Sequence, residues 1–96
     1  MAQEQIGWGI LSTGRIAGIF AKDLKRLPDA HLVAVGSRSL DKAQAFAQEH
    51  GIERAYGCYQ ELMADPQVDI IYVATPHPFH AENTIACLEH GKAVLC

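Results

Sequence analysis

Three short segments of the sequence carry residue types that hold phosphates, cofactors or metals, and each segment directly follows an apolar run. The first has the spacing of the turn G-x-G-x-x-G/A, in which the second glycine lets the backbone approach a pyrophosphate and the third small residue lets a helix pack on a strand. Gly14 and Ala17 occupy those two places, and Ser12 replaces the first glycine. Backbone N–H groups and the dipole at the start of a following helix would then bind phosphate; a plain tight turn is the alternative. The residues of this candidate phosphate loop are Ser12, Thr13, Gly14, Arg15, Ile16 and Ala17.

The second segment predicts which dinucleotide would be bound. An NAD site commonly places Asp or Glu at the end of the second strand, about 20 residues after the glycines, where it holds the ribose 2′-hydroxyl. Here that position reads Ser37-Arg38, and no carboxylate follows before Asp41. The Arg38 guanidinium and the Ser37 hydroxyl suit a 2′-phosphate, to which Lys42 would add a second positive charge. One such charge-assisted bond is worth roughly 1.5–3 kcal/mol, so NADP is favoured over NAD by about 10- to 100-fold; an arginine that only contacts water is the alternative.

The third segment follows the most apolar run of the chain and holds two histidines and two prolines. We expect Thr75, Pro76, His77 and His80 to lie at the mouth of a ligand cleft. The spacing His-x-x-His occurs in metal sites, but a zinc site needs three or four ligands and no third stands nearby, so no metal is predicted. The alternative is that both histidines are polar residues at a helix start. Five further residues are expected to have only structural roles: Trp8, His31, His50, Phe79 and His90.

Hydrophobic periodicity predicts strands that alternate with helices around these segments. Short apolar runs predict strands over residues 6–11, 31–36, 55–56, 69–75 and 92–96. Helical spacing predicts helices from residue 15 to Pro28, from Ser39 or Asp41 to Gly51, over 59–64, and from Pro78 to Gly91. The apolar residues expected on the buried faces of the three long helices are Ile16, Ile19, Phe20, Leu24 and Leu27, then Leu40, Ala43, Phe46 and Ala47, and then Ala81, Ile85 and Leu88.

This alternation predicts an α/β fold with one doubly wound parallel sheet. Strands of nearly continuous apolar sequence are typical of parallel sheets covered by helices on both faces. Right-handed crossovers favour the strand order 3-2-1-4-5. A closed eight-stranded barrel typically needs about 250 residues and is excluded by the 96 present. In open sheets ligands bind outside the carboxyl ends of the strands, which is where the three segments are expected to meet.

Composition narrows the function classes further. The 96 residues are 49% hydrophobic and 20% charged, with a formal net charge of −3, which is typical of one globular domain. No Lys/Arg-rich stretch is present, so nucleic acid is not an expected partner. No apolar run approaches the ~20 residues of a membrane span, and residues 1–5 lack the charged start of a secretory leader. Three cysteines without a C-x-x-C pair indicate reduced thiols in a cytoplasmic protein rather than a disulfide or zinc framework.

Long stretches of the chain resemble one known family. The stretches WGILSTGRIAGIFAKDL, VAVGSRSLDKAQAFAQEHG and AYGCYQELMADPQVDIIYVATPHPFHAENTIACLEHGKAVLC are similar to the N-terminal Rossmann domain of the glucose–fructose oxidoreductase/inositol dehydrogenase/MocA family. Within it they are most similar to the branch of dimeric dihydrodiol dehydrogenase and NADP-dependent D-xylose dehydrogenase. The resemblance covers nearly the whole chain. It implies an NAD(P)-dependent oxidoreductase of sugars, polyols or diols, in which a larger second domain, expected to be absent from this chain, supplies most of the substrate pocket and the dimer surface.

The resemblance also implies roles for the three segments. Residues 12–17 would hold the pyrophosphate, Ser37, Arg38 and Lys42 would face the 2′-phosphate, and the third segment, from Thr75 to His80, would border the nicotinamide ribose and ring. Two departures from the family pattern matter. Ser12 stands where the family has glycine, and the sequence ends at Cys96, directly before the family's Glu-Lys-Pro, whose lysine is its catalytic acid/base. We therefore expect residues 1–96 to form a dinucleotide-binding domain without catalytic residues or turnover of its own.

Two functions of other classes stay open at this point. One is a non-catalytic nucleotide-binding or sensing module, and the other is an excised folding unit that binds only weakly. Cofactor titration distinguishes them from the domain of an NADP-dependent enzyme. If the strand over residues 92–96 lies at a sheet edge, its unpaired N–H and C=O groups would also favour self-association.

Overall fold

The computed structural model describes residues 6–95, apart from the side chain of His77, and contains the predicted elements in the predicted order. The elements are β1 (Ile6–Leu11), α1 (Arg15–Leu24), β2 (Ala30–Gly36), α2 (Leu40–His50), β3 (Arg54–Tyr56), α3 (Tyr59–Met63), β4 (Ile70–Val73), the 3₁₀ helix η1 (His77–Phe79), α4 (His80–Glu89) and β5 (Ala93–Leu95). Helix α2 shows both expected end signals. The Ser39 hydroxyl accepts the Lys42 N–H at 3.4 Å at its start, and Gly51 ends it in the left-handed conformation with φ of 67°, which glycine adopts without strain.

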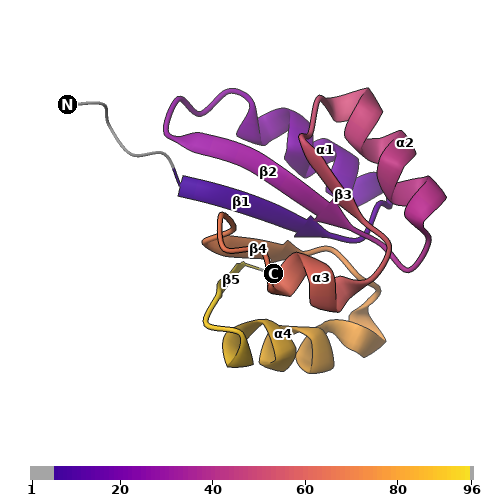
Figure 1. Ribbon diagram of the computed structural model, residues 1–96, viewed down its shortest axis with the longest axis vertical. Coiled ribbons are helices and arrows are strands. Elements are labelled where there is room, and N and C mark those ends of the chain that lie inside the picture. Colours follow the sequence, from indigo (N-terminus) through magenta and orange to yellow (C-terminus); the bar gives the residue numbers. More distant parts are fainter. Residues whose placement is uncertain (1–5, 96) are drawn as a thin grey trace.

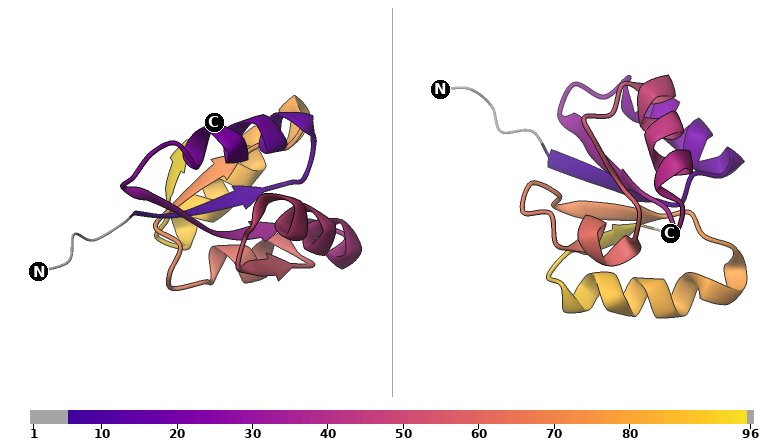
Figure 2. Two further views of the ribbon diagram at one scale, coloured as in Figure 1. Left: turned by 90° about the horizontal axis from the view of Figure 1, so that it is seen from above. Right: turned by 45° about the vertical axis from the view of Figure 1, so that its right-hand side comes forward.

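All described strands form one parallel sheet in the order β3-β2-β1-β4-β5, which confirms the predicted fold class and strand order. Helices α1 and α2 pack on one face of the sheet, and α3 and α4 pack on the other (Figure 1). In the right-hand view of Figure 2, α4 again lies beside β4 and β5, on the side opposite to α1 and α2. Because every strand is parallel, the carboxyl ends of all strands meet at one edge.

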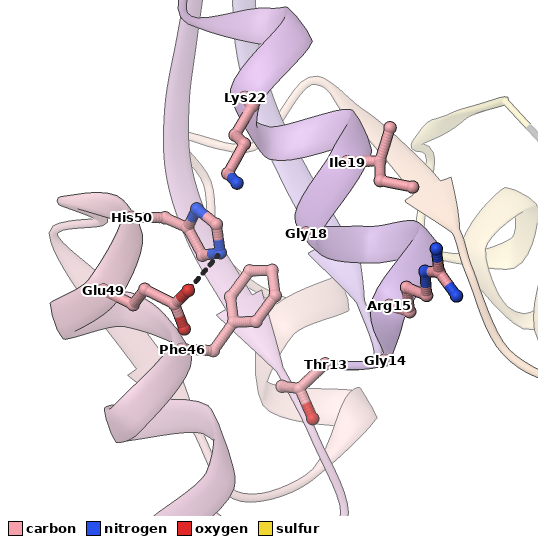
Figure 3. A pocket seen from close by; sticks show the side chains of 9 residues that line it. All are labelled: Thr13, Gly14, Arg15, Gly18, Ile19, Lys22, Phe46, Glu49 and His50. Atoms are coloured by element: carbon pink, nitrogen blue, oxygen red, sulfur yellow. Dashed lines mark ion pairs between the residues drawn. The ribbon is translucent and has the colours of Figure 1, made fainter.

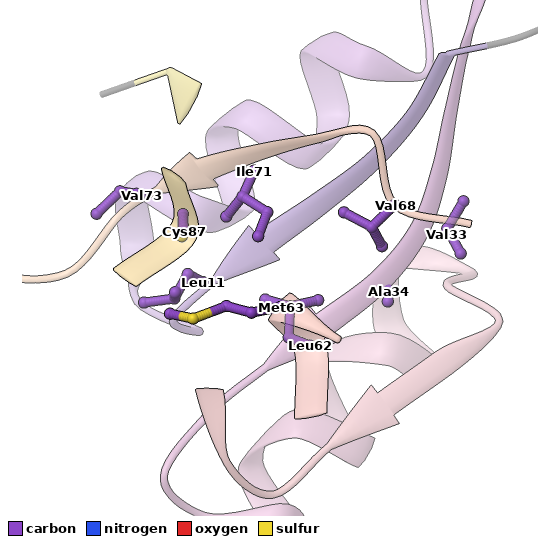
Figure 4. Packing of buried hydrophobic residues seen from close by; sticks show 9 residues of the cluster. All are labelled: Leu11, Val33, Ala34, Leu62, Met63, Val68, Ile71, Val73 and Cys87. Atoms are coloured by element: carbon purple, nitrogen blue, oxygen red, sulfur yellow. The ribbon is translucent and has the colours of Figure 1, made fainter. Parts of the chain in front are cut away.

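Two apolar clusters lie between the sheet and its helices. The cluster on the α3/α4 face (Figure 4) consists of Leu11, Val33, Ala34, Leu62, Met63, Val68, Ile71, Val73 and Cys87. The cluster on the α1/α2 face consists of Ile10, Ala17, Ala21, Val35, Ala43, Phe46, Ala47 and Ile52. Successive residues of a strand point to opposite faces, so β1 contributes Ile10 to one cluster and Leu11 to the other. Both side chains are fully buried.

Helix α1 buries smaller residues than its apolar periodicity predicts. Its buried side chains are Ala17, Ala21 and Leu24. The prediction was wrong for Ile16 and Ile19, which are 61% and 53% exposed. It was also wrong for Leu27, because the helix ends at Leu24 and Leu27 lies exposed in the turn that follows. A helix that presents alanines to a sheet lies close to it, so the larger isoleucines are left on its outer surface.

Helices α2 and α4 depart from the prediction for a related reason. Leu40, the first residue of α2, is largely exposed, and in α4 only Cys87 is buried, while Ala81, Ile85 and Leu88 face solvent. Periodicity identifies an apolar stripe on a helix, but it does not say how much sheet lies beneath it. Helix α4 packs beside β5, a strand of three residues at the edge of the sheet, which is too narrow to cover the whole stripe.

The α1 face of the sheet is covered unevenly. Ile10, Tyr72 and Leu95 are paired across β1, β4 and β5, so their side chains point to the same face. Ile10 is fully buried, Tyr72 is half-buried, and Leu95 is 42% exposed. Phe20 of α1 stacks on Tyr72 with 3.9 Å between ring centroids. The cover that α1 provides therefore decreases from β1 to β5.

A buried carboxylate links β3 to the loop before β4. Asp65 accepts hydrogen bonds from Arg54 Nη1 at 2.9 Å to each oxygen, from the Tyr56 hydroxyl at 2.8 Å and from the Gln67 N–H at 2.9 Å. Lys92, the residue before β5, donates from Nζ to the backbone carbonyl of Asp65 at 2.7 Å, so the same group of contacts also holds the start of β5. Burial raises the pKa of the Asp65 carboxyl, but these hydrogen bonds and the Arg54 charge outweigh burial and leave the pKa below its ordinary value.

Candidate functional site

The register of the sheet brings the three candidate segments to one edge. Leu11 is paired with Gly36 on one side and with Val73 on the other. These residues are the last of β1, β2 and β4, and the candidate segments begin at most two residues after them. The register of the strands thus brings the three segments together at the carboxyl edge of the sheet, as predicted.

The candidate phosphate loop leaves the start of α1 open. Gly14 precedes the helix, and no described side chain caps it. The first intrahelical bond runs from the Gly18 N–H to the Gly14 carbonyl, 3.1 Å. The N–H groups at the helix start therefore have no intrahelical partner, and a Cβ placed on Gly14 would meet no atom within 4 Å. Free donors beside open space fit the phosphates of a dinucleotide.

Ser12 holds the backbone conformation that the missing glycine would provide. Its φ is 105°, in a region that residues with a Cβ rarely adopt. Its N–H donates to the Gly36 carbonyl at 2.8 Å, which ties the loop to the end of β2. Such strain costs on the order of 1–3 kcal/mol and concentrates at functional sites. Ser12 therefore adopts a backbone conformation that glycine would adopt without this strain.

The second segment presents the charged side chain of Arg38 at the carboxyl edge of the sheet, and a hydrogen bond of Ser37 fixes the backbone on either side of it. Arg38 is exposed. Ser37 is only 7% exposed, and its hydroxyl accepts the Ser39 N–H at 3.2 Å. Lys42 lies one turn into α2 and is exposed. Ser37 therefore shapes the loop that presents Arg38.

The third segment is anchored to α4. Thr75 is 5% exposed, and its hydroxyl accepts a hydrogen bond from Asn83 Nδ2 at 2.8 Å. The Pro76 carbonyl accepts the Phe79 N–H at 2.9 Å, which forms the short η1 turn. His80 is half-buried at the start of α4. The side chain of His77 lies outside the described part of the structure.

One pocket joins the second and third segments. It has a volume of about 280 Å³, and we call it the edge pocket. Its lining residues are Arg38, Tyr59, Gln60, Thr75, Pro76, Phe79, Glu82 and Asn83. The sequence prediction assigned Arg38 to one end of the dinucleotide and Thr75 and Pro76 to the other, whereas the structure places all three around the same pocket. Phe79 was expected to have a packing role; it is 46% exposed and lines the pocket, because η1 carries it to the rim.

A second hollow, of about 420 Å³, begins at the phosphate loop and runs between α1 and α2. Figure 3 shows Phe46 and His50 of α2 directed toward Gly18 of α1, with Arg15 directed away from them. The His50 ring lies 4.4 Å from the Phe46 ring, centroid to centroid. Lys42 lines an adjoining hollow together with Thr13 and Gly14, so its charge lies on the phosphate-loop side and not in the edge pocket.

Four residues of the edge pocket were not predicted from the sequence: Tyr59, Gln60, Glu82 and Asn83. They lie in the first turns of α3 and α4. In this topology both helices begin at the carboxyl edge because each follows a strand. The first turn of every predicted helix was therefore the signal that could have found them.

Comparison with known proteins decides the family. The profile of the GFO_IDH_MocA oxidoreductase family, with an NAD-binding Rossmann fold, matches residues 6–96. The chain belongs to this family. Trans-1,2-dihydrobenzene-1,2-diol dehydrogenase from Xenopus laevis is 52% identical over 91 residues, which are 93% of this chain and 28% of that protein. The human protein of the same name is 47% identical over 91 residues, or 27% of its length.

Comparison with solved structures supports the same fold. KijD10, a 3-ketoreductase from Actinomadura kijaniata determined with TDP-benzene and NADP, matches with a TM-score of 0.91 and 30% identity, over 96% of this chain and 29% of its own. The chain spans little more than a quarter of these relatives. Residues 6–95 form the NAD(P)-binding Rossmann domain of an oxidoreductase of this family.

The described residues were also compared with the requirements of a metal site and of a membrane span. Among the side chains that the structure describes, which do not include that of His77, no three His, Cys, Asp or Glu are grouped so that they could hold a metal ion. In the same part of the chain, no helix has the length and apolar character needed to cross a membrane. Cys58 and Cys87 are free thiols.

Proposed function

We propose that this domain binds NADP in preference to NAD, with the phosphates at the start of α1. The uncapped helix end and the open space at Gly14 carry the proposal, because free N–H groups and a positive helix dipole stabilise phosphate there. Ser12, Thr13, Gly14, Arg15, Ile16 and Ala17 would surround the pyrophosphate. The bound cofactor would supply the hydride acceptor or donor, and the residues of this chain would position it.

In this proposal the edge pocket receives the adenosine end of the cofactor. Arg38 would bind the 2′-phosphate with its guanidinium, beside the hydroxyl of Ser37. Lys42 would neutralise charge on the phosphate-loop side, where it lies with Thr13 and Gly14. His77 and His80, which follow β4, would border the nicotinamide end. Thr75 and Pro76, which line the edge pocket, would lie between the two ends of the cofactor.

Titration of the chain with NADPH and NADH tests this assignment. By isothermal titration calorimetry we expect NADPH to bind about 10- to 100-fold more tightly than NADH, because one charge-assisted bond distinguishes them. Arg38→Met should remove this preference and leave NADH binding unchanged. Arg26→Met, which changes an exposed arginine in the turn after α1, serves as the matched control. Tighter binding of NADH, or an unchanged preference in Arg38→Met, would contradict the assignment.

For the whole protein we propose hydride transfer between the nicotinamide of NADP and a carbon of a sugar, polyol or diol. The similarity to trans-1,2-dihydrobenzene-1,2-diol dehydrogenases supports a diol as the first substrate to test. The measurement is NADPH formation by the full-length protein with trans-dihydrobenzenediol, and in parallel with sugars and polyols. Absence of NADPH formation with all three classes would rule the proposal out.

We further propose that β5 mediates self-association of the 96-residue chain. β5 lies at the edge of the sheet, and its residues Ala93, Val94 and Leu95 carry no charge that would block pairing with another strand. Sedimentation velocity should detect dimers that disappear in Leu95→Lys. A strict monomer at high concentration would contradict this part of the proposal.

A further inference from the structure

The edge pocket contains two opposite charges that do not neutralise each other. Arg38 lines it from the loop after β2, and Glu82 lines it from the first turn of α4. Among the side chains that the structure describes, neither of them forms an ion pair or a hydrogen bond. A pocket with a free cation and a free carboxylate on different walls suits a ligand that has an anionic group and a hydrogen-bond donor at separate ends.

The size of the pocket limits what it holds. About 280 Å³ is just below the ~300 Å³ at which pockets for drug-sized ligands begin, so it suits one heterocycle and its sugar rather than a whole dinucleotide. Tyr59, Pro76 and Phe79 supply apolar surface around it, and a flat base makes favourable contact with aromatic rings. The remainder of a dinucleotide would run along the edge toward the phosphate loop.

The other polar lining groups are less suited to select a base. Asn83 already donates its amide to the buried Thr75 hydroxyl at 2.8 Å. Gln60 offers both a donor and an acceptor, so it accommodates either an amino or a carbonyl group. Glu82 is the one carboxylate among the lining residues that the structure describes, and an ionised carboxylate only accepts hydrogen bonds.

We infer that Glu82 selects adenine by accepting a hydrogen bond from its 6-amino group, while Arg38 on the opposite wall holds the 2′-phosphate. The inference rests on the proposed binding of NADP and adds a base-selecting residue on α4. A base with a carbonyl at position 6, such as hypoxanthine, has no donor at that position, so this hydrogen bond would be lost. The domain would therefore discriminate between purines as well as between the two ribose forms.

The test compares NADPH with reduced nicotinamide hypoxanthine dinucleotide phosphate by calorimetry. We expect the unmodified chain to prefer NADPH by about 10- to 100-fold, the range of one charge-assisted hydrogen bond. Glu82→Met keeps the length of the side chain and removes the acceptor, so the preference should fall at least fivefold. Glu89→Met changes an exposed glutamate at the other end of α4 and should leave the preference intact.

The outcomes separate this inference from the function on which it rests. If the chain prefers NADPH to NADH but Glu82→Met leaves the base preference within twofold of the unmodified chain, the role of Glu82 is overturned and NADP binding stands. If the chain binds neither NADPH nor the hypoxanthine analogue, both proposals fall. Circular dichroism checks that Glu82→Met is folded. Because the Glu82 side chain is exposed, we expect the substitution to leave the fold intact.

Discussion

Replacing Asp65 by asparagine should destabilise the domain far more than the same change four residues later. In Asp65→Asn one acceptor oxygen becomes a donor, and the charge that faces Arg54 is lost. Arg54 then loses a charge-assisted contact worth roughly 1.5–3 kcal/mol. Removing one partner of a fully buried pair costs about 3–5 kcal/mol, but the Arg54 side chain is 34% exposed and water replaces part of the loss. We therefore expect a loss of about 2–3 kcal/mol in the free energy of unfolding.

Thermal unfolding followed by circular dichroism measures this effect. For a domain of this length, 1 kcal/mol shifts Tm by roughly 4–8 °C, so Asp65→Asn should lower Tm by about 8–24 °C. Asp69→Asn is the matched control, because the exposed Asp69 accepts one hydrogen bond from the described residues, from the Gly7 N–H at 2.8 Å, and asparagine can accept it too. The control should lose less than about 1 kcal/mol. Equal losses in the two variants would refute the reasoning.

The pH dependence of stability provides a second criterion for Asp65. Because the pKa of its carboxyl is lower in the folded protein than in the unfolded chain, the stabilisation is complete above the unfolded value of about 4 and is lost as pH falls through the folded value. The difference between the unmodified chain and Asp65→Asn should thus be constant at neutral pH and shrink below about pH 4. A difference that does not change with acidification would mean that the charge of Asp65 contributes nothing.

Substitutions at three further positions test the loop and the sheet. Ser12→Gly should raise stability by about 1 kcal/mol because it relieves the positive φ, whereas Ser12→Ala should not; equal Tm values for these two variants would contradict the strain argument. Gly7→Ala should cost about 3 kcal/mol or prevent folding, because a Cβ there collides with the Gln67 carbonyl oxygen in the turn before β4; a native Tm would show that this turn moves aside at little cost. Gly14→Ala should fold normally, since its Cβ would enter open space, yet bind NADPH about tenfold more weakly if that space receives the pyrophosphate; unchanged affinity would place the phosphates elsewhere.

The fold was predictable because local and long-range signals agree. Ser39 and Gly51 mark both ends of α2, and apolar runs mark the strands, so the alternation alone leads to the parallel sheet. The buried faces of the helices were less predictable. Ile16 and Ile19 have the periodicity of a buried stripe, yet Ala17 and Ala21 form the contact, because the closeness of helix and sheet is decided by packing across the whole layer. Such a choice between two stripes on one helix requires the tertiary structure.

The candidate site was predictable loop by loop but not as a pocket. Each loop carries its own motif, and the strand order brings the loops to one edge. Which loops share a pocket depends on helices that the motifs do not include: Tyr59 on α3 and Glu82 on α4 complete the pocket around Arg38. Lys42 lies close to Arg38 in sequence but lines a different hollow, because α2 turns its side chain toward the phosphate loop.

The uneven cover of the sheet by α1 has a consequence for hydrogen exchange. Leu95 and Ala93 are exposed beside the β5 hydrogen bonds, so amide protons in β5 exchange through local openings. The last three residues of β1, Gly9, Ile10 and Leu11, are buried, so their amide protons exchange only when the whole domain unfolds. The edge pocket is walled by the loop after β2 and by the loop after β4 with its helix. A dinucleotide base held between these walls would oppose the separation of the two halves of the sheet. Its presence would then slow exchange in β4 and β5, on the far side of the sheet from β3.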